Sequence, residues 1–356
     1  LPVALAMTVL LAFALIQIFW TIGALSLYRE HAFQVFVIAL ALSTAGSLVP
    51  FAIVCFVDRR ERESRWLILV TLLWGALIAT GVAIPFNDAI LLAIDAAIQD
   101  EPAVTDFLGP DAAWLIGAPI AGPWVEEILK SAGIVLIFVF LRGEFDGIRD
   151  GFIYGALVGI GFNWLEAAVY VGKGFAEIGL APFGLQLGAR YALFGLSGHA
   201  LYSGLFGAFL GWASQTNRPW WRIAAPVIGL GLAIGAHTVN NSLGLIFTAI
   251  ESANGQPSTE EVVAPFDLPF WQVWVTDSLF DLFLYAPFLL ILLALLLYSA
   301  GWERNVIRTE LADEVPVTVT PEEYVQVLGD RLFRTRRIDG AHRRQSAELV
   351  NAQNEL

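Results

Sequence analysis

Residues 150–170, DGFIYGALVGIGFNWLEAAVY, form an almost continuously apolar stretch whose only acid after the first position is Glu166. About 20 apolar residues are enough to cross the ~30 Å hydrocarbon core of a bilayer as one helix. Gly151, Gly155 and Gly159 recur there at four-residue spacing, and small residues at that spacing let helix backbones approach closely in lipid. The stretch therefore predicts a tightly packed transmembrane helix with a buried carboxylate.

The rest of the chain is similarly apolar. Of its 356 residues, 57% are hydrophobic, and the mean hydropathy of +0.67 exceeds what a single soluble core can use. We predict an all-α polytopic membrane protein with about eight transmembrane helices in a domain over 1–298, core motifs at 118–245 and a polar cytoplasmic tail over 299–356. The predicted spans are 3–28, 33–57, 66–85, 113–141, 151–171, 191–213, 223–249 and 271–298.

The first span has no basic region before it and is longer than the apolar core of a signal peptide. We therefore expect a retained helix rather than a removed leader. Cys55, in the second span, is the only cysteine of the chain. It excludes an intrachain disulfide and is expected to be a small packing residue.

Arginines are concentrated in alternate connections between the spans. The connections 86–112 and 250–270 contain acids but no lysine or arginine. Because Lys and Arg mark cytoplasmic loops, we predict a multi-pass protein of the cell membrane with both termini cytoplasmic. Nucleic-acid binding has no support, since the arginines follow the topology and form no groove interleaved with aromatic residues. The connecting arginines on the predicted cytoplasmic side are Arg59, Arg60, Arg62, Arg65, Arg142, Arg149, Arg218 and Arg222.

Ionisable and polar groups interrupt four of the spans. Each charged group at mid-membrane costs at least ~2.5–3.5 kcal/mol, so this many together need an explanation. Counted from the predicted cytoplasmic ends at the helical rise, one group of each span lies about 21–23 Å above that face. Four helices thus bring these groups to one layer in the outer half of the bilayer. The groups are Glu126, Glu127 and Lys130 in the fourth span, Glu166 in the fifth, His199 in the sixth, and His237 with Asn241 in the seventh.

Two prolines precede the paired glutamates. Pro123 suits the first position of a new helical turn, which predicts that Glu126 and Glu127 lie near a helix N-terminus, where carboxylates are stabilised. Lys130 follows at three- and four-residue spacing and can offset one charge. We expect a shared polar pocket built from spans 4 to 7.

The set favours hydrolysis, because it contains a carboxylate able to activate water and groups able to bind a metal or an oxyanion. A proton- or ion-coupled transporter is the main alternative, since buried acids also form ion pathways. A non-catalytic membrane scaffold, with these groups as structural hydrogen-bond partners, is the third.

At these residues the sequence resembles the PrsW family of intramembrane proteases, within the wider superfamily of CAAX-type and bacteriocin-processing membrane proteases. The resemblance covers about 118–245. Its motifs, in order, are APIAGPWVEEILKSAG with an EExxK core, FxxxE from Phe162 to Glu166, GHALYSGLFGAFLG around His199, and HxxxN from His237 to Asn241. The FxxxE motif ends in Glu where CAAX-type relatives have His.

The resemblance implies a protease that cuts membrane-anchored protein substrates near the extracytoplasmic side, in some relatives an anti-sigma factor. It further implies that Glu126 and Glu127 are the catalytic pair and that Glu166, His199 and His237 complete the site.

Two chemistries fit these residues. In the metal version Glu166, His199 and His237 bind zinc, and Glu126 or Glu127 acts as the base. In the metal-free version Glu126 activates water directly, and His237 with Asn241 stabilises the tetrahedral oxyanion.

Weaker signals lie elsewhere in the chain. Asp277 and Asp281 share one face of the last span, and Asp281 is expected near the same layer, as a structural group or as support behind the site. Within 86–112 a short amphipathic segment indicates an interfacial helix or an ordinary loop helix. Gly, Pro and Ser in 250–270 indicate a mobile connection, and 321–338 is a candidate partner-binding helix in an otherwise solvated tail.

Overall fold

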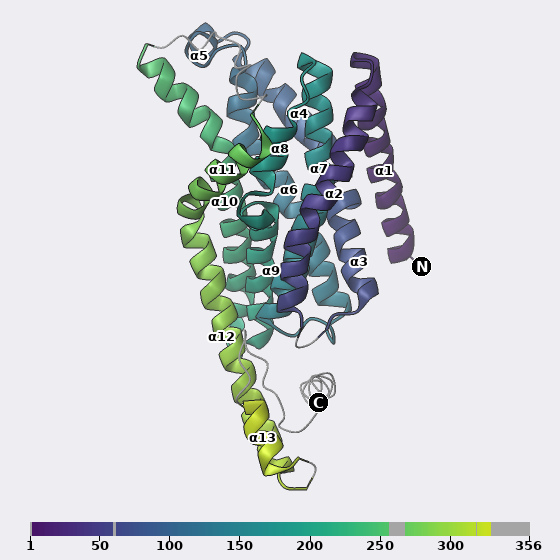
Figure 1. Ribbon diagram of the computed structural model, residues 1–356, viewed down its shortest axis with the longest axis vertical. Helices are drawn as coiled ribbons and strands as arrows, with labels where there is room; N and C mark the ends of the chain where they lie inside the picture. The colour runs from purple at the N-terminus through teal and green to yellow at the C-terminus, as the bar shows by residue number, and fades with distance from the viewer. Residues whose placement is uncertain (1, 60–61, 256–267, 318, 329–356) are drawn as a thin grey trace.

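The computed structural model describes residues 2–59, 62–255, 268–317 and 319–328, and within these ranges it contains helices and no strand (Figure 1). Seven helical segments in this part of the chain are long and apolar enough to cross a membrane. The 29-residue helix α6 (Ala112–Phe140), which carries the paired glutamates, lies among them, and we count it as an eighth crossing. The predicted all-α polytopic fold is confirmed.

The first three crossings form one side of the bundle. Helices α1 (Pro2–Tyr28) and α2 (Ala32–Val57) match their predicted spans. The third crossing consists of α3 (Arg65–Leu73), a π-helical turn (Trp74–Ala79) and α4 (Thr80–Ile98), followed by the short α5 (Pro102–Leu108). It therefore runs well beyond the predicted end at residue 85. The extension is held by α6, because Leu91 of α4 fills the space beside Gly117.

Helix α6 is continuous through both of its prolines, so the expectation of a new helix start at Pro123 is wrong. A proline removes one backbone hydrogen bond, but α6 packs against α4 on one side and α10 (Pro219–Ala253) on the other. This packing keeps the helix intact. Glu126 and Glu127 consequently lie in a helix interior, where Lys130 rather than a helix terminus offsets their charge.

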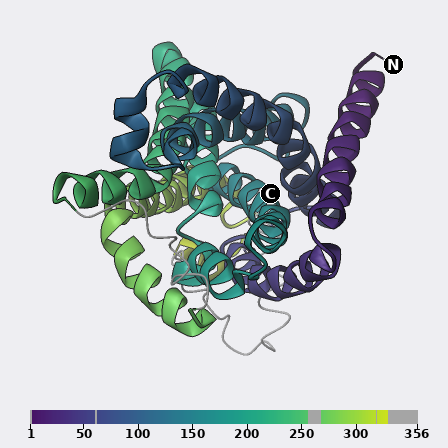
Figure 2. The same ribbon diagram turned by 90° about the horizontal axis from the view of Figure 1, so that it is seen from above.

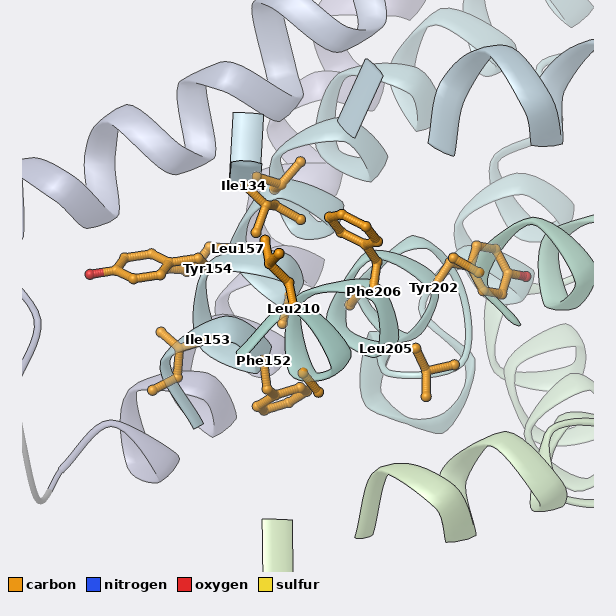
Figure 3. Packing of buried hydrophobic residues seen from close by; sticks show 14 of the residues in the cluster. Ile134, Phe152, Ile153, Tyr154, Leu157, Tyr202, Leu205, Phe206 and Leu210 are labelled. Carbon is orange, nitrogen blue, oxygen red and sulfur yellow. The ribbon is translucent and has the colours of Figure 1, made fainter. Parts of the chain in front are cut away.

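Helix α7 (Ile148–Ile178) is the centre of the molecule. Within its apolar window 94% of the residues are buried, against 11% for α1, which lies at the edge of the bundle in Figure 2. Its main partner is α9 (His199–Gln215). Figure 3 shows Leu157 of α7 beside Leu210 of α9, with the Tyr154 ring pointing away from α9. These residues, with Phe152 and Phe206, belong to the largest hydrophobic cluster.

Glycines bring α7 and α9 into backbone contact, as the four-residue spacing predicts. A Cβ atom at Gly151 would lie 2.0 Å from the carbonyl oxygen of Gly207, and one at Gly155 would lie 2.2 Å from that of Ser203. A Cβ at Gly159 would lie 2.2 Å from the carbonyl oxygen of His199. The glycine face therefore fixes the distance between α7 and the first residue of α9.

The sixth crossing is broken where a single span over 191–213 was predicted. Helix α8 (Phe183–Arg190) and a 3₁₀ turn (Ala192–Gly195) precede α9. Leu193, Phe194 and Gly195 have φ angles of 45°, 61° and 74°, a left-handed conformation that only glycine adopts readily. These three residues reverse the chain, so the regular helix begins at His199.

Contacts from α11 (Phe270–Leu284) hold this turn. The backbone N–H of Leu193 donates to Ser278 Oγ at 2.9 Å, and Trp274 Nε1 donates to the carbonyl of Tyr191 at 2.8 Å. The Tyr191 hydroxyl is anchored to Ser43 of α2 at 2.6 Å. Partners from distant parts of the chain thus stabilise a conformation that its own residues disfavour.

The predicted last span, 271–298, is two helices. Helix α11 ends at Leu284, and α12 (Ala286–Glu310) begins after Tyr285. Pro287 explains the break, because it has no N–H to bond back into α11 and restricts the residue before it. Helix α11 packs on α8, whereas α12 follows α9 and extends beyond the bundle in Figure 1.

Helix α12 runs through the predicted domain boundary at residue 298 to Glu310, and a 3₁₀ turn (Leu311–Glu314) and α13 (Pro321–Leu328) follow. The candidate partner-binding helix over 321–338 is described only as far as residue 328. Most of the connection 250–270, for which mobility is predicted, lies outside the described residues.

Candidate active site

The two adjacent glutamates of α6 have different environments. Glu127 is fully buried; its Oε1 accepts hydrogen bonds from Lys130 Nζ at 2.8 Å and from His237 Nδ1 at 2.9 Å. Glu126 instead lines a cavity, and its Oε1 accepts from Asn87 Nδ2 of α4 at 3.1 Å. Adjacent residues of a helix point about 100° apart, so only Glu126 can meet a molecule in the cavity.

Lys130 is the centre of the hydrogen-bond network. Its side chain is fully buried, and Nζ lies 3.3 Å from Glu126 Oε2, 2.8 Å from Glu127 Oε1 and 2.7 Å from His199 Nδ1. An ammonium group has three donors and no acceptor, so these three partners use all of them. Nζ also lies 3.8 Å from the centre of the Phe162 ring, in the cation–π arrangement.

These bonds fix the protons of both histidines. Because Lys130 donates to His199 Nδ1, the proton of neutral His199 is on Nε2, which donates to Glu166 Oε2 at 2.8 Å. His237 has the opposite tautomer, since its Nδ1–H donates to Glu127 and leaves the Nε2 lone pair 4.0 Å from Glu126 Oε2. The two imidazole rings lie 5.0 Å apart.

Glu166, on α7, completes the cluster. Its Oε2 accepts from His199 and, at 2.5 Å, from Nη1 of Arg190 at the end of α8. The ring of Tyr202 stacks on that of His237 at 4.9 Å, and the Tyr202 hydroxyl bonds that of Tyr285 at 2.8 Å. Elements from α6 to α12 therefore hold the groups in place.

Two cavities meet at this cluster. One, of about 380 Å³, is lined by Glu126, Glu166, both histidines and residues of α10 and α11. The other, of about 440 Å³, shares Glu126 and Glu166 and extends between α4, α7 and α8. Asn241 and Asp281 both line the first cavity. The Asn241 amide donates one hydrogen to the carbonyl of Ala118 at 3.1 Å and has a second one available.

A candidate metal-binding group also lies here. Among the described residues, Glu126, His199 and His237 each offer one ligand atom, and these atoms lie within 4.8 Å of one another. Glu166 is outside that group, and its Oε2 accepts from Arg190 and His199.

The structure thus brings together the site residues named from the sequence, either in the hydrogen-bond network or in the lining of the cavities. Sequence reasoning missed Asn87, Arg190 and Tyr202. The available signals were the polar amide of Asn87 within 86–112 and the isolated Arg190 beside an apolar span. Nothing in the sequence indicated the partners of either residue.

A family model described as the PrsW family intramembrane metalloprotease matches residues 63–271, more than half of the chain. The chain belongs to the PrsW family. The matched range contains the ionisable residues of the cluster, and the resemblance found in the sequence motifs is confirmed. These residues are Glu126, Glu127, Lys130, Glu166, Arg190, His199 and His237. Among curated relatives, Protease PrsW of Geobacillus kaustophilus (strain HTA426) is 32% identical over 100 residues, which are 26% of this chain and 40% of the relative's length. No solved structure matches.

The PrsW family description implies a metal, and the residues present fit one. One carboxylate and two imidazoles are the ligand set of many catalytic zinc sites. His237 has the arrangement expected of a ligand, with Nδ1–H held by a carboxylate and the Nε2 lone pair free. His199 has its proton on Nε2, so ligation there requires the loss of one proton from the Lys130–His199 pair.

Proposed function

We propose that this protein hydrolyses peptide bonds of membrane-anchored protein substrates near the extracytoplasmic side of the cell membrane. The observation that supports this best is the position of Glu126, a buried carboxylate held by Asn87 and Lys130 at the junction of two cavities. Single-span anti-sigma factors are the first substrate class to test. In the orientation we propose, both termini and the tail after residue 298 are cytoplasmic, because the arginine-containing connections lie on that side.

In the metal-free scheme, the proposed reaction begins with Glu126 as the general base. A water molecule in the cavity gives a proton to this carboxylate as its oxygen attacks the peptide carbonyl, and Glu126 then passes the proton to the leaving amine nitrogen. The second amide hydrogen of Asn241 is available to the oxyanion. Glu127 acts from behind the cavity by fixing the tautomer and orientation of His237.

For the metal scheme we propose Glu126, His199 and His237 as the residues that would hold zinc, in place of the sequence-derived set with Glu166; Glu126 would then be a ligand rather than the free base. A bound zinc supplies a more acidic water and polarises the peptide carbonyl. The metal-free scheme, in which Glu126 alone activates water, is the alternative that the following experiment separates.

Substitution of His237 by Ala is expected to remove bound metal, because two remaining ligands hold zinc weakly. We expect about one equivalent of zinc in wild-type protein and less than about a tenth in His237→Ala, measured by elemental mass spectrometry after purification in detergent. Glu166→Gln is the matched control and should retain the metal, whereas it would lose it if Glu166 were a ligand. Full activity in wild-type protein without metal would leave only the metal-free scheme.

A cleavage assay in proteoliposomes tests the proposed function itself. Tagged single-span peptides are incubated with the reconstituted protein, and the products are sized by mass spectrometry. We expect a cut near the outer end of the substrate helix. Intact substrates together with flux that depends on a pH gradient would support the transporter instead, and the absence of both activities would support a scaffold.

A further inference from the structure

We propose that Arg190 is a positioning residue for this chemistry: by holding Glu166, it fixes the ring orientation of His199. The inference rests on the proposed protease function. Arg190 is the last residue of α8, in the segment that precedes the broken start of α9. Its position there places the guanidinium against α7 and beside the first residue of α9.

The contacts of Arg190 define its geometry. Nη1 donates to Glu166 Oε2 at 2.5 Å and to Asn163 Oδ1 at 3.4 Å, while Nε donates to Gln186 Oε1 at 3.2 Å. The guanidinium lies 4.9 Å from the centre of the Tyr170 ring. The Arg190 side chain is 19% exposed and that of Glu166 is 11% exposed. A charged pair this well shielded from water is costly to break on one side only.

The pair is connected to Glu126 by a chain of hydrogen bonds. Glu166 Oε2 accepts from both Arg190 and His199 Nε2, and His199 Nδ1 accepts from Lys130. Lys130 in turn donates to Glu126 Oε2. Removal of the guanidinium would free Glu166 to turn away, and the His199 ring would lose the contact that holds its Nε2 side.

The charge balance of the cluster also supports this role of Arg190. The cluster holds three carboxylates, those of Glu126, Glu127 and Glu166, and Lys130 can offset only one of them. Among the described residues that touch these carboxylates, Arg190 is the only other permanent cation. Without it, Glu166 would be a buried carboxylate beside a second one in the shared cavities, and like charges at short range oppose each other.

A double-mutant cycle tests this role through activity. Arg190→Met and Glu166→Gln are each expected to lower kcat about 10- to 100-fold, the range for partners that orient reacting groups, with KM changed less than about threefold. The double variant should be no slower than the slower single variant, because both changes break one contact. Multiplied effects, or a raised KM with unchanged kcat, would instead show direct binding of substrate by Arg190 and overturn the inference. A wild-type kcat in Arg190→Met would also overturn the inference.

A spectroscopic measurement tests it without any substrate. In metal-free protein labelled with ¹⁵N at histidine, the signals of the imidazole nitrogens report the hydrogen bond that each one makes. We expect the His199 Nε2–H signal to shift in Arg190→Met relative to wild-type protein, because Nε2–H no longer donates to a fixed Glu166 carboxylate. An unchanged His199 signal in that variant would overturn the inference. Absence of cleavage by wild-type protein would contradict only the proposed function.

Arg149→Met is the matched control for loss of a buried arginine. Arg149 pairs with Glu303 of α12, outside both cavities. We expect it to lower thermal stability and to leave kcat and the His199 signal unchanged. Arg190→Lys should recover part of the rate, because a lysine retains the charge but not the planar guanidinium. A loss of rate in Arg149→Met equal to that in Arg190→Met would assign both effects to stability and refute the positioning role.

Discussion

Glu126→Gln is expected to lower the rate of peptide cleavage by about 10²- to 10⁴-fold, the usual contribution of a general base. Glutamine has the same shape and its side-chain oxygen can still accept from Asn87 or Lys130, which now bond to Glu126 at 3.1 and 3.3 Å. The fold should therefore survive while the proton acceptor is lost. Cleavage of a membrane-anchored peptide and thermal unfolding, measured on the same preparation, separate the two effects.

Two further variants sharpen this test. Glu251→Gln, at an exposed position of α10, should cleave at the wild-type rate. Glu127→Gln should reduce both stability and rate, because Glu127 is fully buried and holds Lys130 and His237 rather than facing the cavity. Retention of more than about a tenth of the rate in Glu126→Gln would exclude Glu126 as the base, since general-base contributions begin at about 10²-fold.

Gly155→Leu is expected to destabilise the protein by about 3 kcal/mol or more, the upper range for overpacking, and to abolish cleavage. A Cβ at this position would lie 2.2 Å from the carbonyl oxygen of Ser203, and the backbone of α9 cannot yield as a flexible side chain can. Helices α7 and α9 would have to separate, which takes His199 away from Glu166. Thermal unfolding in detergent and the cleavage assay measure the two losses.

The matched control is Gly231→Leu on α10, where a Cβ meets no atom within 4 Å. This change adds the same volume to a transmembrane helix and should leave stability and activity near the wild-type values. Equal unfolding temperatures for the two leucine variants would show that the glycine contact between α7 and α9 is not needed for the fold.

The membrane class, most helix ends and the glycine face could be predicted because each depends on the local sequence. A run of about 20 apolar residues is enough to place its own helix in the bilayer. Glycines at four-residue spacing lie on one face of a helix, whichever helix packs against that face. The candidate site was found for a related reason: charged groups are rare in such runs, so Glu126, Lys130 and Glu166 stand out.

Two of the errors arose where distant residues compete with local preference. Pro123 predicts a helix start, but packing of α4 and α10 on α6 keeps the helix continuous. The local sequence predicts a helix over 191–198, but hydrogen bonds with Ser278 and Trp274 of α11 hold this segment in a left-handed turn.

The sequence by itself determined that this protein is a polytopic helical membrane protein and which ionisable residues gather in one layer of it, because hydrophobicity and helical spacing are local properties. Only the tertiary structure decided that Glu126 faces the cavity while Glu127 lies behind it, and that Arg190 pairs with Glu166. Those assignments depend on which side chains meet across helices that are far apart in the chain. A buried polar group is stabilised only by partners in the right geometry, and the position of those partners is set by the packing of α6, α7, α9 and α10 around one another.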